Sequence, residues 1–213
     1  MTSADETHFS ILLGGTLKPT PRLMRQIQGS RVIAADGGIL HADTLGLTAE
    51  LWVGDFDSTP EMDQIRFDHV QRETHPANKN RTDGEIAIEA AIARGATRLT
   101  LVSGLGGQAD HVLGHFMLAQ RYAQQGLTIT ITSGDEEAYP LLPGRHEIDL
   151  PSESRISIIP LTALGQLTLQ NVHWPLKDAS VPLGSTWTLS NRSKGPVQVE
   201  LATGYGMVIA YPA

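Results

Sequence analysis

The sequence contains no cysteine and no long apolar run, and each absence excludes a class of protein. Without cysteine there is no disulfide and no thiolate ligand, so a metal must bind to oxygen or imidazole. Apolar runs such as residues 11–13 and 156–161 are far shorter than the roughly 20 residues that a membrane-spanning helix needs. Residues 1–10 are polar and acidic, unlike a secretory signal. We therefore expect a cytoplasmic protein without a membrane segment.

Basic residues are also in the minority. Lys and Arg number 16 against 23 Asp and Glu, which gives a formal net charge of -7. Nucleic-acid binders need a basic surface for the phosphate backbone, so DNA and RNA are not expected partners. The length of 213 residues and the hydrophobic content of 40% allow one large domain or two small ones, each with a packed core.

The first part of the chain alternates short apolar runs with segments of helical periodicity, which is typical of βαβ units around a parallel sheet. We expect strands at residues 9–13, 31–35, 51–54, 69–74, 99–103 and 128–132, and the clearest helices at 83–94 and 111–124. The pattern predicts an α/β domain with a parallel sheet over residues 1–138.

The pattern changes after Tyr139, where Pro140, Pro143 and Gly144 predict a linker. Strands without convincing helices follow at residues 146–150, 155–159, 166–171, 186–190, 197–201 and 207–211, with one longer gap after residue 172. This spacing predicts a small all-β sandwich over residues 139–213. Because so small a domain has little core of its own, we expect it to use a partner surface, as in a homodimer.

Four aspartates fall where predicted strands end and loops begin. They are Asp36, Asp55, Asp57 and Asp83. Ligands of open parallel sheets collect at the carboxyl ends of the strands, and carboxylates beside substrate phosphates are what a Mg²⁺–nucleotide site requires. In an extended segment Asp55 and Asp57 would point the same way while Phe56 points into the core. A single Asp is also typical of a turn or helix cap, but four at strand ends favour a metal site.

A glycine-rich segment, residues 103–111 (Ser-Gly-Leu-Gly-Gly-Gln-Ala-Asp-His), joins a predicted strand to a predicted helix. Its backbone N–H groups and the helix N-terminus favour an anion such as phosphate. The spacing of Gly104, Gly106 and Ala109 also resembles a dinucleotide-binding fingerprint, but it comes late in the α/β segment. Tight strand–helix packing is an alternative role for these glycines. The Gly-x-x-x-x-Gly-Lys-Ser/Thr motif is absent, which excludes a P-loop protein.

Histidines and cations lie beside these motifs. His111 and His115 have the spacing of half a zinc site, but the Glu expected after the first His is missing, so we expect one near the loop and the other packed or exposed. Lys79 and Arg81 precede Thr82 and would bring positive charge to ATP phosphates, or else line a solvated loop.

Two tryptophans and a Ser-Asn pair are the notable residues of the β part. We expect Trp187 in the core, as for most tryptophans of small sandwiches. Trp174 lies in a polar, proline-containing loop, where it would offer an aromatic face to a flat or cationic ligand, an interaction worth about 0.5–2 kcal/mol. Ser190 and Asn191 complete the set.

Taken in order, Ala-Asp-Gly-Gly38, Gly-Asp-Phe-Asp-Ser58, Lys79-x-x-Thr-Asp83, Gly106-Gly-x-x-Asp-His111 and Ser-Asn191 resemble the motif series of the thiamine pyrophosphokinase family. The resemblance implies a Rossmann-like domain that binds ATP, a β-sandwich domain, and a homodimer with thiamine held where the subunits meet. It implies transfer of pyrophosphate from ATP to the thiamine hydroxyl, giving thiamine diphosphate and AMP. It implies that Asp36, Asp55, Asp57 and Asp83 hold Mg²⁺, the last three being catalytic, and that Asp110 and His111 line the ATP site. We also expect ATP to contact Asp36, Gly37, Lys79, Arg81, Thr82, Gly106, Gly107 and Gln108, and thiamine to contact Trp174, Ser190 and Asn191.

Two positions depart from the family pattern and keep two alternatives open. The family usually has Asp where this chain has Asn80, and Arg where it has Gln108, so one anion and one cation are lost, with Arg81 as a replacement charge. A non-catalytic nucleotide or thiamine sensor is one alternative. The other is a haloacid-dehalogenase-type phosphatase, whose nucleophile motif resembles Asp55-x-Asp57-x-Thr59; its acidic pair would come from residues 134–137.

Overall fold

The computed structural model describes residues 7–56, 61–76 and 80–213. The chain divides into two compact units, the first made of Met1–His115 with Gly126–Gly134 and the second of Phe116–Gln125 with Asp135–Ala213. Within the described ranges, every helix is too short or too polar to cross a membrane.

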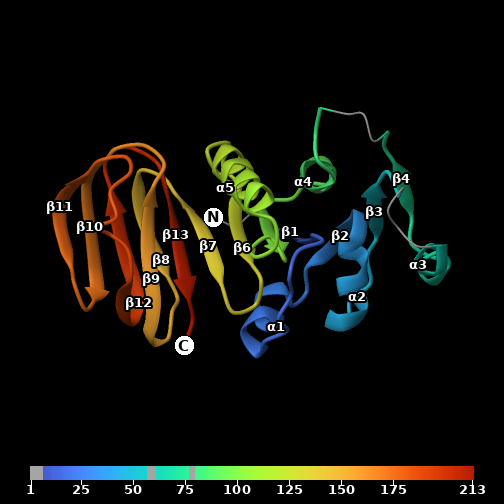
Figure 1. The fold of residues 1–213 in the computed structure, drawn as a ribbon, viewed down its shortest axis with the longest axis horizontal. Coiled ribbons are helices and arrows are strands. Elements are labelled where there is room, and N and C mark those ends of the chain that lie inside the picture. Colours follow the sequence, from blue (N-terminus) through green and yellow to red (C-terminus); the bar gives the residue numbers. More distant parts are fainter. Residues whose placement is uncertain (1–6, 57–60, 77–79) are drawn as a thin grey trace, which may run out of the picture. The chain divides into compact units, whose positions relative to one another are not determined.

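The N-terminal unit is built on a parallel sheet (Figure 1). Its strands lie in the order β6 (Thr128–Thr132), β5 (Arg98–Val102), β1 (His8–Leu12), β2 (Arg31–Ala35), β3 (Leu51–Gly54) and β4 (Arg72–Thr74), and each neighbouring pair is parallel. The strand order reverses beside β1, with β2 on one side and β5 on the other. In open α/β sheets such a reversal opens a crevice at the carboxyl ends of the strands, so the most favourable ligand position is between β1 and β5.

Helices α1 (Pro21–Ile27) and α2 (Leu40–Leu45) pack on one face of this sheet, and α4 (Asp83–Ala93) packs on the other. The remaining helices are the 3₁₀ helix η1 (Asp36–Ile39), α3 (Glu61–Arg66) and α5 (Ala109–Ala123), the last of which runs from the first unit into the second. Buried residues of α1 and α2 join one cluster with Leu12, Val32 and Trp52 of the sheet. Helix α4 contacts β1, β2 and β3 and lies on the other side of these strands in Figure 1. The predicted helices α4 and α5 are confirmed, whereas the shorter α1, α2 and α3 were not predicted.

The second unit contains seven strands, all paired in antiparallel fashion. They are β7 (Glu137–Leu141), β8 (Gly144–Ile148), β9 (Ser152–Pro160), β10 (Leu164–Val172), β11 (Leu176–Val181), β12 (Asn191–Leu201) and β13 (Gly206–Tyr211). One layer has the order β7-β13-β9 and the other β8-β12-β10-β11. Apolar side chains on alternate positions of these strands form one core. The predicted combination of a parallel α/β part and a sandwich-like β part is confirmed.

Strand β12 belongs to both layers of this sandwich. Its first residues pair with β9, for example Asn191 with Ile156, and its last residues pair with β8, for example Val197 with Ile148. Gly195 lies between the two halves with φ 125°, a conformation that favours glycine. The strand therefore changes sheet at Gly195, the way in which sandwich corners are commonly made.

Four details of the β part differ from the sequence prediction. The predicted linker is wrong because β7 runs through Pro140, which pairs with Met207; proline has no N–H and is tolerated where the ladder does not need that donor. The predicted strand at 186–190 is wrong, since a turn is held there by Thr188 Oγ1, which donates to Ile158 O at 2.6 Å. Strand β11 fills the gap after residue 172 instead. Trp187 is not in the core but 60% exposed.

Candidate active site at the carboxyl ends of the parallel strands

The loops that follow β1, β2 and β5 pack against one another backbone to backbone. A Cβ added to Gly38 would lie 2.1 Å from Leu12 O, and one added to Gly15 would lie 2.2 Å from Ser103 O. Real Cβ atoms do not approach carbonyl oxygens so closely, so both contacts depend on glycine. These contacts bring the segments after β1, β2 and β5 together at one edge of the sheet, where the strand order reverses.

Asp36 and Asp55 lie at this edge, directly after the adjacent strands β2 and β3. Ala35 pairs with Val53 at the ends of β2 and β3, and a Cβ added to Gly54 would lie 3.4 Å from Asp36 Cα. Asp36 has φ 44°, and its carbonyl accepts a hydrogen bond from Trp52 Nε1 at 2.9 Å. Both aspartates are partly buried. The backbone after β2 is therefore anchored to a core indole and places the Asp36 Cα and Cβ beside Gly54, which directly precedes Asp55.

Phe56 anchors the loop after β3 in the same way. Its ring packs edge-on against Trp52, with ring centroids 4.7 Å apart, which confirms that Phe56 points towards the core. Its φ of 60° is left-handed, however, so the extended geometry predicted for residues 55–57 is wrong at this position. An aromatic residue in this conformation is strained, and such strain is commonly found in loops that carry function.

Asp83 reaches the same edge from helix α4, of which it is the first residue. Thr82 caps this helix by accepting a hydrogen bond from Glu85 N at 3.2 Å. A Cβ added to Gly84 would lie 3.0 Å from Leu13 Cδ2, so the start of α4 packs over the segment that follows β1. The Thr82 hydroxyl thus serves the helix, and Asp83 opens it at the carboxyl ends of the strands.

The predicted site also includes two cations, Lys79 and Arg81, and a fourth aspartate, Asp57. Asp57 and Lys79 lie outside the described residues. Arg81 forms an exposed ion pair with Glu89 of α4. Within the described residues no group of three or more His, Asp or Glu side chains is close enough to hold a metal ion. The donors present are carboxylate oxygens, which is the chemistry that Mg²⁺ prefers, and the set of four aspartates stays a prediction.

The glycine-rich loop after β5 has a conformation that only glycine adopts easily. Gly106 and Gly107 have φ of 80° and 97°, and both are exposed. A Cβ added to Gly104 would lie 2.5 Å from Ile131 Cγ2, so the start of the loop also packs tightly on β6. The loop therefore packs closely at Gly104 and forms an exposed turn at Gly106 and Gly107, and its role in binding phosphate stays a prediction.

Residues at the start of α5 extend this loop. The Gln108 carbonyl accepts a hydrogen bond from Val112 N at 3.1 Å, and Asp110 Oδ1 accepts one from His111 N at 2.9 Å. His115 Nδ1 lies 2.9 Å from Gly104 O, which ties the helix to the loop. Burial lowers the pKa of His115, the hydrogen bond to Gly104 opposes this, and the charge of His111 adds to the lowering. His115 is therefore a neutral structural tie, whereas His111 is exposed.

The loop formed by Gly14, Gly15 and Thr16 after β1 belongs to this edge but was not predicted from the sequence. Gly15 contacts Ser103, and a Cβ added to Gly106 would lie 3.4 Å from Thr16 Cβ. His41 Nε2 lies 2.9 Å from Gly15 O and supports the loop from α2. The signal that would have found it is a Gly-Gly pair directly after the first apolar strand.

Ser103, directly after β5, lowers the stability of the fold in two ways. It is a buried non-glycine residue with φ 62°, and its Oγ has no hydrogen-bond partner among the described residues. Left-handed backbone and an unpaired buried hydroxyl each cost about 1 kcal/mol or more. We therefore expect Ser103→Gly to raise the free energy of unfolding by about 1 kcal/mol, and the Tm by about 2–4 °C, measured by calorimetry. Ser103→Ala, which removes only the hydroxyl, should gain less; a Tm for Ser103→Gly at or below that of the unsubstituted protein would contradict this explanation.

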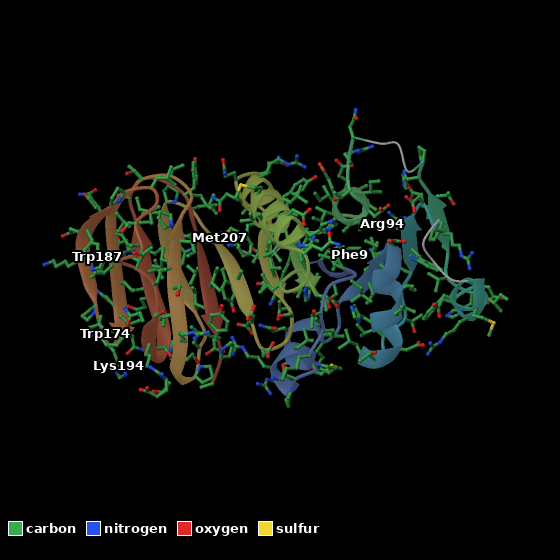
Figure 2. All side chains as sticks on the ribbon, viewed as in Figure 1. Phe9, Arg94, Trp174, Trp187, Lys194 and Met207 are labelled. Atoms are coloured by element: carbon green, nitrogen blue, oxygen red, sulfur yellow. The ribbon has the colours of Figure 1, made fainter. Side chains whose placement is uncertain are left out.

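The predicted thiamine residues come together at one end of the β unit. Trp174 lies on the turn between β10 and β11 and is 61% exposed. The side chain of Asn191, at the start of β12, forms hydrogen bonds with the backbone of Trp174. Ser190, with φ 61°, is exposed and donates its N–H to Ser157 Oγ at 3.0 Å. Figure 2 marks Trp174 and Trp187 on the side of the unit that carries β10 and β11.

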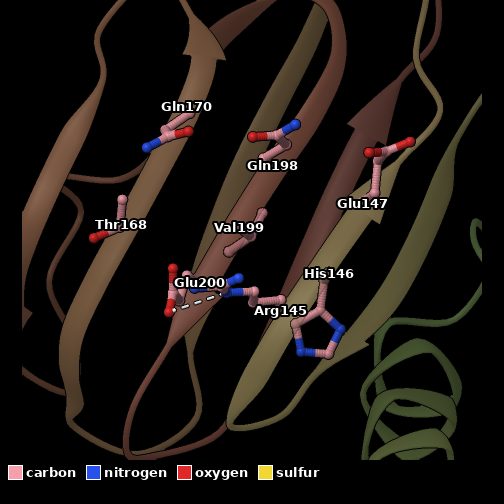
Figure 3. A pocket seen from close by; sticks show the side chains of 8 residues that line it. All are labelled: Arg145, His146, Glu147, Thr168, Gln170, Gln198, Val199 and Glu200. Atoms are coloured by element: carbon pink, nitrogen blue, oxygen red, sulfur yellow. Dashed lines mark ion pairs between the residues drawn. The ribbon is translucent and has the colours of Figure 1, made fainter.

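A separate hollow lies on the outer face of β8, β10 and β12 (Figure 3). Its volume is about 500 Å³, and an ion pair between Arg145 and Glu200, 3.3 Å apart, crosses it. The remaining lining residues are His146, Glu147, Thr168, Gln170, Gln198 and Val199. This hollow contains none of the site residues predicted from the sequence.

The fold and the site define an open-sheet α/β protein with acidic and glycine-rich loops at the carboxyl ends of its strands, joined to a β-sandwich unit. Two sequence families match this chain in the same order. "Thiamin pyrophosphokinase, catalytic domain" matches residues 25–131, and "Thiamin pyrophosphokinase, vitamin B1 binding domain" matches residues 145–208. The chain belongs to the thiamin pyrophosphokinase family.

Known proteins of similar sequence and structure agree with this assignment. The thiamine pyrophosphokinase of Bacillus subtilis (strain 168) is 28% identical over 163 residues, covering 75% of this chain and 76% of the relative. A crystal structure of thiamine pyrophosphokinase from Bacillus subtilis superposes with a TM-score of 0.86 at 23% identity, covering 96% of this chain and 99% of the other. A structure from Geobacillus thermodenitrificans has a TM-score of 0.83 at 26% identity, with 97% and 98% covered.

Proposed function

We propose that this protein is a thiamine diphosphokinase that transfers the diphosphate group of ATP to the hydroxyl of thiamine, giving thiamine diphosphate and AMP. The observation that carries the proposal is the match of both family domains, catalytic and vitamin B1 binding, in chain order. The placement of Asp36, Asp55 and Asp83 at the carboxyl edge of the parallel sheet supports it.

ATP would bind at this edge, where the strand order reverses. The loops at Gly15 and Gly106 place exposed or tightly turned backbone beside the start of α5, and such backbone N–H groups favour phosphate oxygens. In this proposal the ATP site is completed by Gly37, Lys79, Arg81, Thr82, Gly107, Gln108, Asp110 and His111. Arg81 and Thr82 would first exchange their present partners, Glu89 and the α4 backbone, for phosphate.

Mg²⁺ would be held by carboxylates of Asp36, Asp55, Asp57 and Asp83, since hard cations prefer oxygen and the chain offers no thiolate. Bound there, it would neutralise charge on the phosphate oxygens of ATP. The contribution of the chain is to fix these acids: Asp36 through the bond of its carbonyl to Trp52, Asp55 through Phe56 packing, and Asp83 through the capped start of α4.

In the reaction the thiamine hydroxyl oxygen attacks the β-phosphorus of ATP. The new O–P bond forms as the bond from the β-phosphorus to the α,β-bridging oxygen breaks, AMP leaves with that electron pair, and the hydroxyl proton is released. Phosphoryl transfers of this kind depend on positioning and charge neutralisation more than on a strong base. The exposed Trp174 indole would hold the positive thiazolium ring. We further propose a cytoplasmic homodimer, with thiamine bound where the subunits meet.

The proposal is tested by incubating the purified protein with ATP, Mg²⁺ and thiamine and separating the products by chromatography. We expect AMP and thiamine diphosphate in equal amounts, loss of both products when a chelator removes Mg²⁺, and recovery when Mg²⁺ is restored in excess. Inorganic phosphate with an aspartyl-phosphate on Asp55 would instead establish a phosphatase. Bound thiamine or ATP without AMP would establish a sensor.

A further inference from the structure

Asn191 uses its side chain to hold the backbone of a residue that is distant in sequence. It is only 8% exposed. Its Nδ2 donates to Trp174 O at 2.7 Å, and its Oδ1 accepts from Trp174 N at 3.1 Å and from Arg192 N at 2.8 Å. One buried amide therefore satisfies both backbone groups of Trp174, as a paired strand residue would.

This contact begins where the strand ladder ends. The pairing of β10 with β12 stops at Val172 with Ser193, and His173 N then donates to Arg192 O at 2.8 Å. Asn191 continues the line one residue further by means of its side chain. Without the Asn191 side chain, the Trp174 N–H and C=O would lose these hydrogen bonds, and the turn between β10 and β11 would be less restrained.

The indole itself points away from this anchor. Trp174 is 61% exposed although its backbone is fixed on both sides. His173, whose ring centroid lies 5.9 Å from that of Trp174, is held in turn by Glu153 Oε1 at 2.9 Å. A rigid backbone under an exposed aromatic ring is the arrangement that lowers the ordering cost of binding a ligand.

We propose that Asn191 is a positioning residue for thiamine, which acts by fixing the Trp174 turn and does not itself contact the substrate. This inference rests on the proposed function. It changes the role expected for Asn191 from the family resemblance, because its recorded hydrogen bonds all go to backbone groups and its side chain is buried. Trp174 is then the residue that touches thiamine, and Asn191 acts through it.

The test is a double-mutant cycle on the KM for thiamine, with the KM for ATP measured in parallel. Asn191→Ala and Trp174→Ala should each raise the KM for thiamine by about ten-fold, the scale of a cation–aromatic contact, and leave the KM for ATP unchanged. If Asn191 acts only through Trp174, the double variant is no worse than Trp174→Ala alone. A multiplicative loss of about a hundred-fold in the double variant would show that Asn191 contacts thiamine independently and would overturn the proposal.

Two further variants separate positioning from general stability. Ser193→Ala is a matched control on the same strand, since Ser193 is fully buried and its Oγ donates to Pro151 O and accepts from Ser154 N, away from the Trp174 turn. It should lower the Tm as Asn191→Ala does, yet leave the KM for thiamine unchanged. Asn191→Asp keeps the acceptor oxygen but not the donor to Trp174 O, so its KM should fall between those of the unsubstituted protein and Asn191→Ala.

Motion of the indole gives a readout that needs no turnover. A Trp187→Phe background leaves two tryptophans, the exposed Trp174 and the fully buried Trp52. In this background, fast local motion seen by time-resolved fluorescence anisotropy reports on Trp174. Asn191→Ala should add fast local motion that Ser193→Ala does not, and equal motion in the two variants would overturn the positioning role. Absence of thiamine turnover in the unsubstituted protein would refute the proposed function, while the anisotropy would still decide whether Asn191 fixes the indole.

Discussion

Replacing Asp55 by Asn is expected to lower kcat for thiamine diphosphate formation by about 10²–10³-fold while leaving the fold intact. Asn has the same shape, so the loop after β3 keeps the Phe56–Trp52 contact that shapes it. What is lost is one negative charge at the edge where Mg²⁺ and the phosphates of ATP would sit, and electrostatic terms of this kind are usually the largest in phosphoryl transfer. The measurement is steady-state AMP formation together with a thermal unfolding curve.

Asp43→Asn is the matched control for this substitution. Asp43 lies on α2 in the same unit, pairs with Arg66 and is partly exposed, so the same chemical change is made away from the site. It should leave kcat unchanged, because exposed ion pairs contribute little. If kcat of Asp55→Asn lies within a few-fold of that of the unsubstituted protein, and kcat of Asp43→Asn is unchanged, then Asp55 takes no part in the reaction.

The largest expected effect on stability is that of Gly38→Ala. The added Cβ would lie 2.1 Å from Leu12 O and 2.6 Å from Leu12 C, both backbone atoms of the central strand β1. Backbone cannot rotate away as a long side chain can, so η1 must move off the sheet and take Asp36 with it. We expect the free energy of unfolding to fall by about 3 kcal/mol or more, measured by urea unfolding.

The neighbouring Gly37 is the control for backbone entropy. A Cβ at Gly37 meets no atom within 4 Å, so Gly37→Ala tests the loss of a glycine in the same 3₁₀ helix without the clash. Its unfolding free energy should lie within about 1 kcal/mol of the unsubstituted value. Equal stabilities of the two variants would show that the contact between η1 and β1 does not depend on the missing side chain at Gly38.

Much of the N-terminal unit could be predicted from the sequence because its signals are local. Buried parallel strands read as short apolar runs, and the segment from Asp83 is rich in helix-forming apolar residues up to Gly95. The face expected to be buried there was only partly right, since Ile86 is buried but Ala93 is exposed. The aspartates at strand ends follow from the same reasoning, since the carboxyl ends of parallel strands share one edge. The helices α1, α2 and α3 have only 6 or 7 residues, too few for a helical period to be recognised.

What the sequence could not predict depends on contacts between distant segments. Tryptophan is usually a core residue in small sandwiches. The turn that carries Trp187, however, is held by two hydrogen bonds between Thr188 and Ile158, and the indole stays exposed. The left-handed Phe56 is set by its packing on Trp52. The bond between Asn191 and Trp174 spans 17 residues and has no local sequence signal.

The fate of labelled phosphate in ATP tests the central claim most directly. With Mg²⁺ and thiamine present, ATP labelled at the γ-phosphate should pass its label to thiamine diphosphate, and ATP labelled at the α-phosphate should leave its label in AMP. Release of the γ-label as inorganic phosphate, with ADP as the other product and no label in a thiamine compound, would contradict the account.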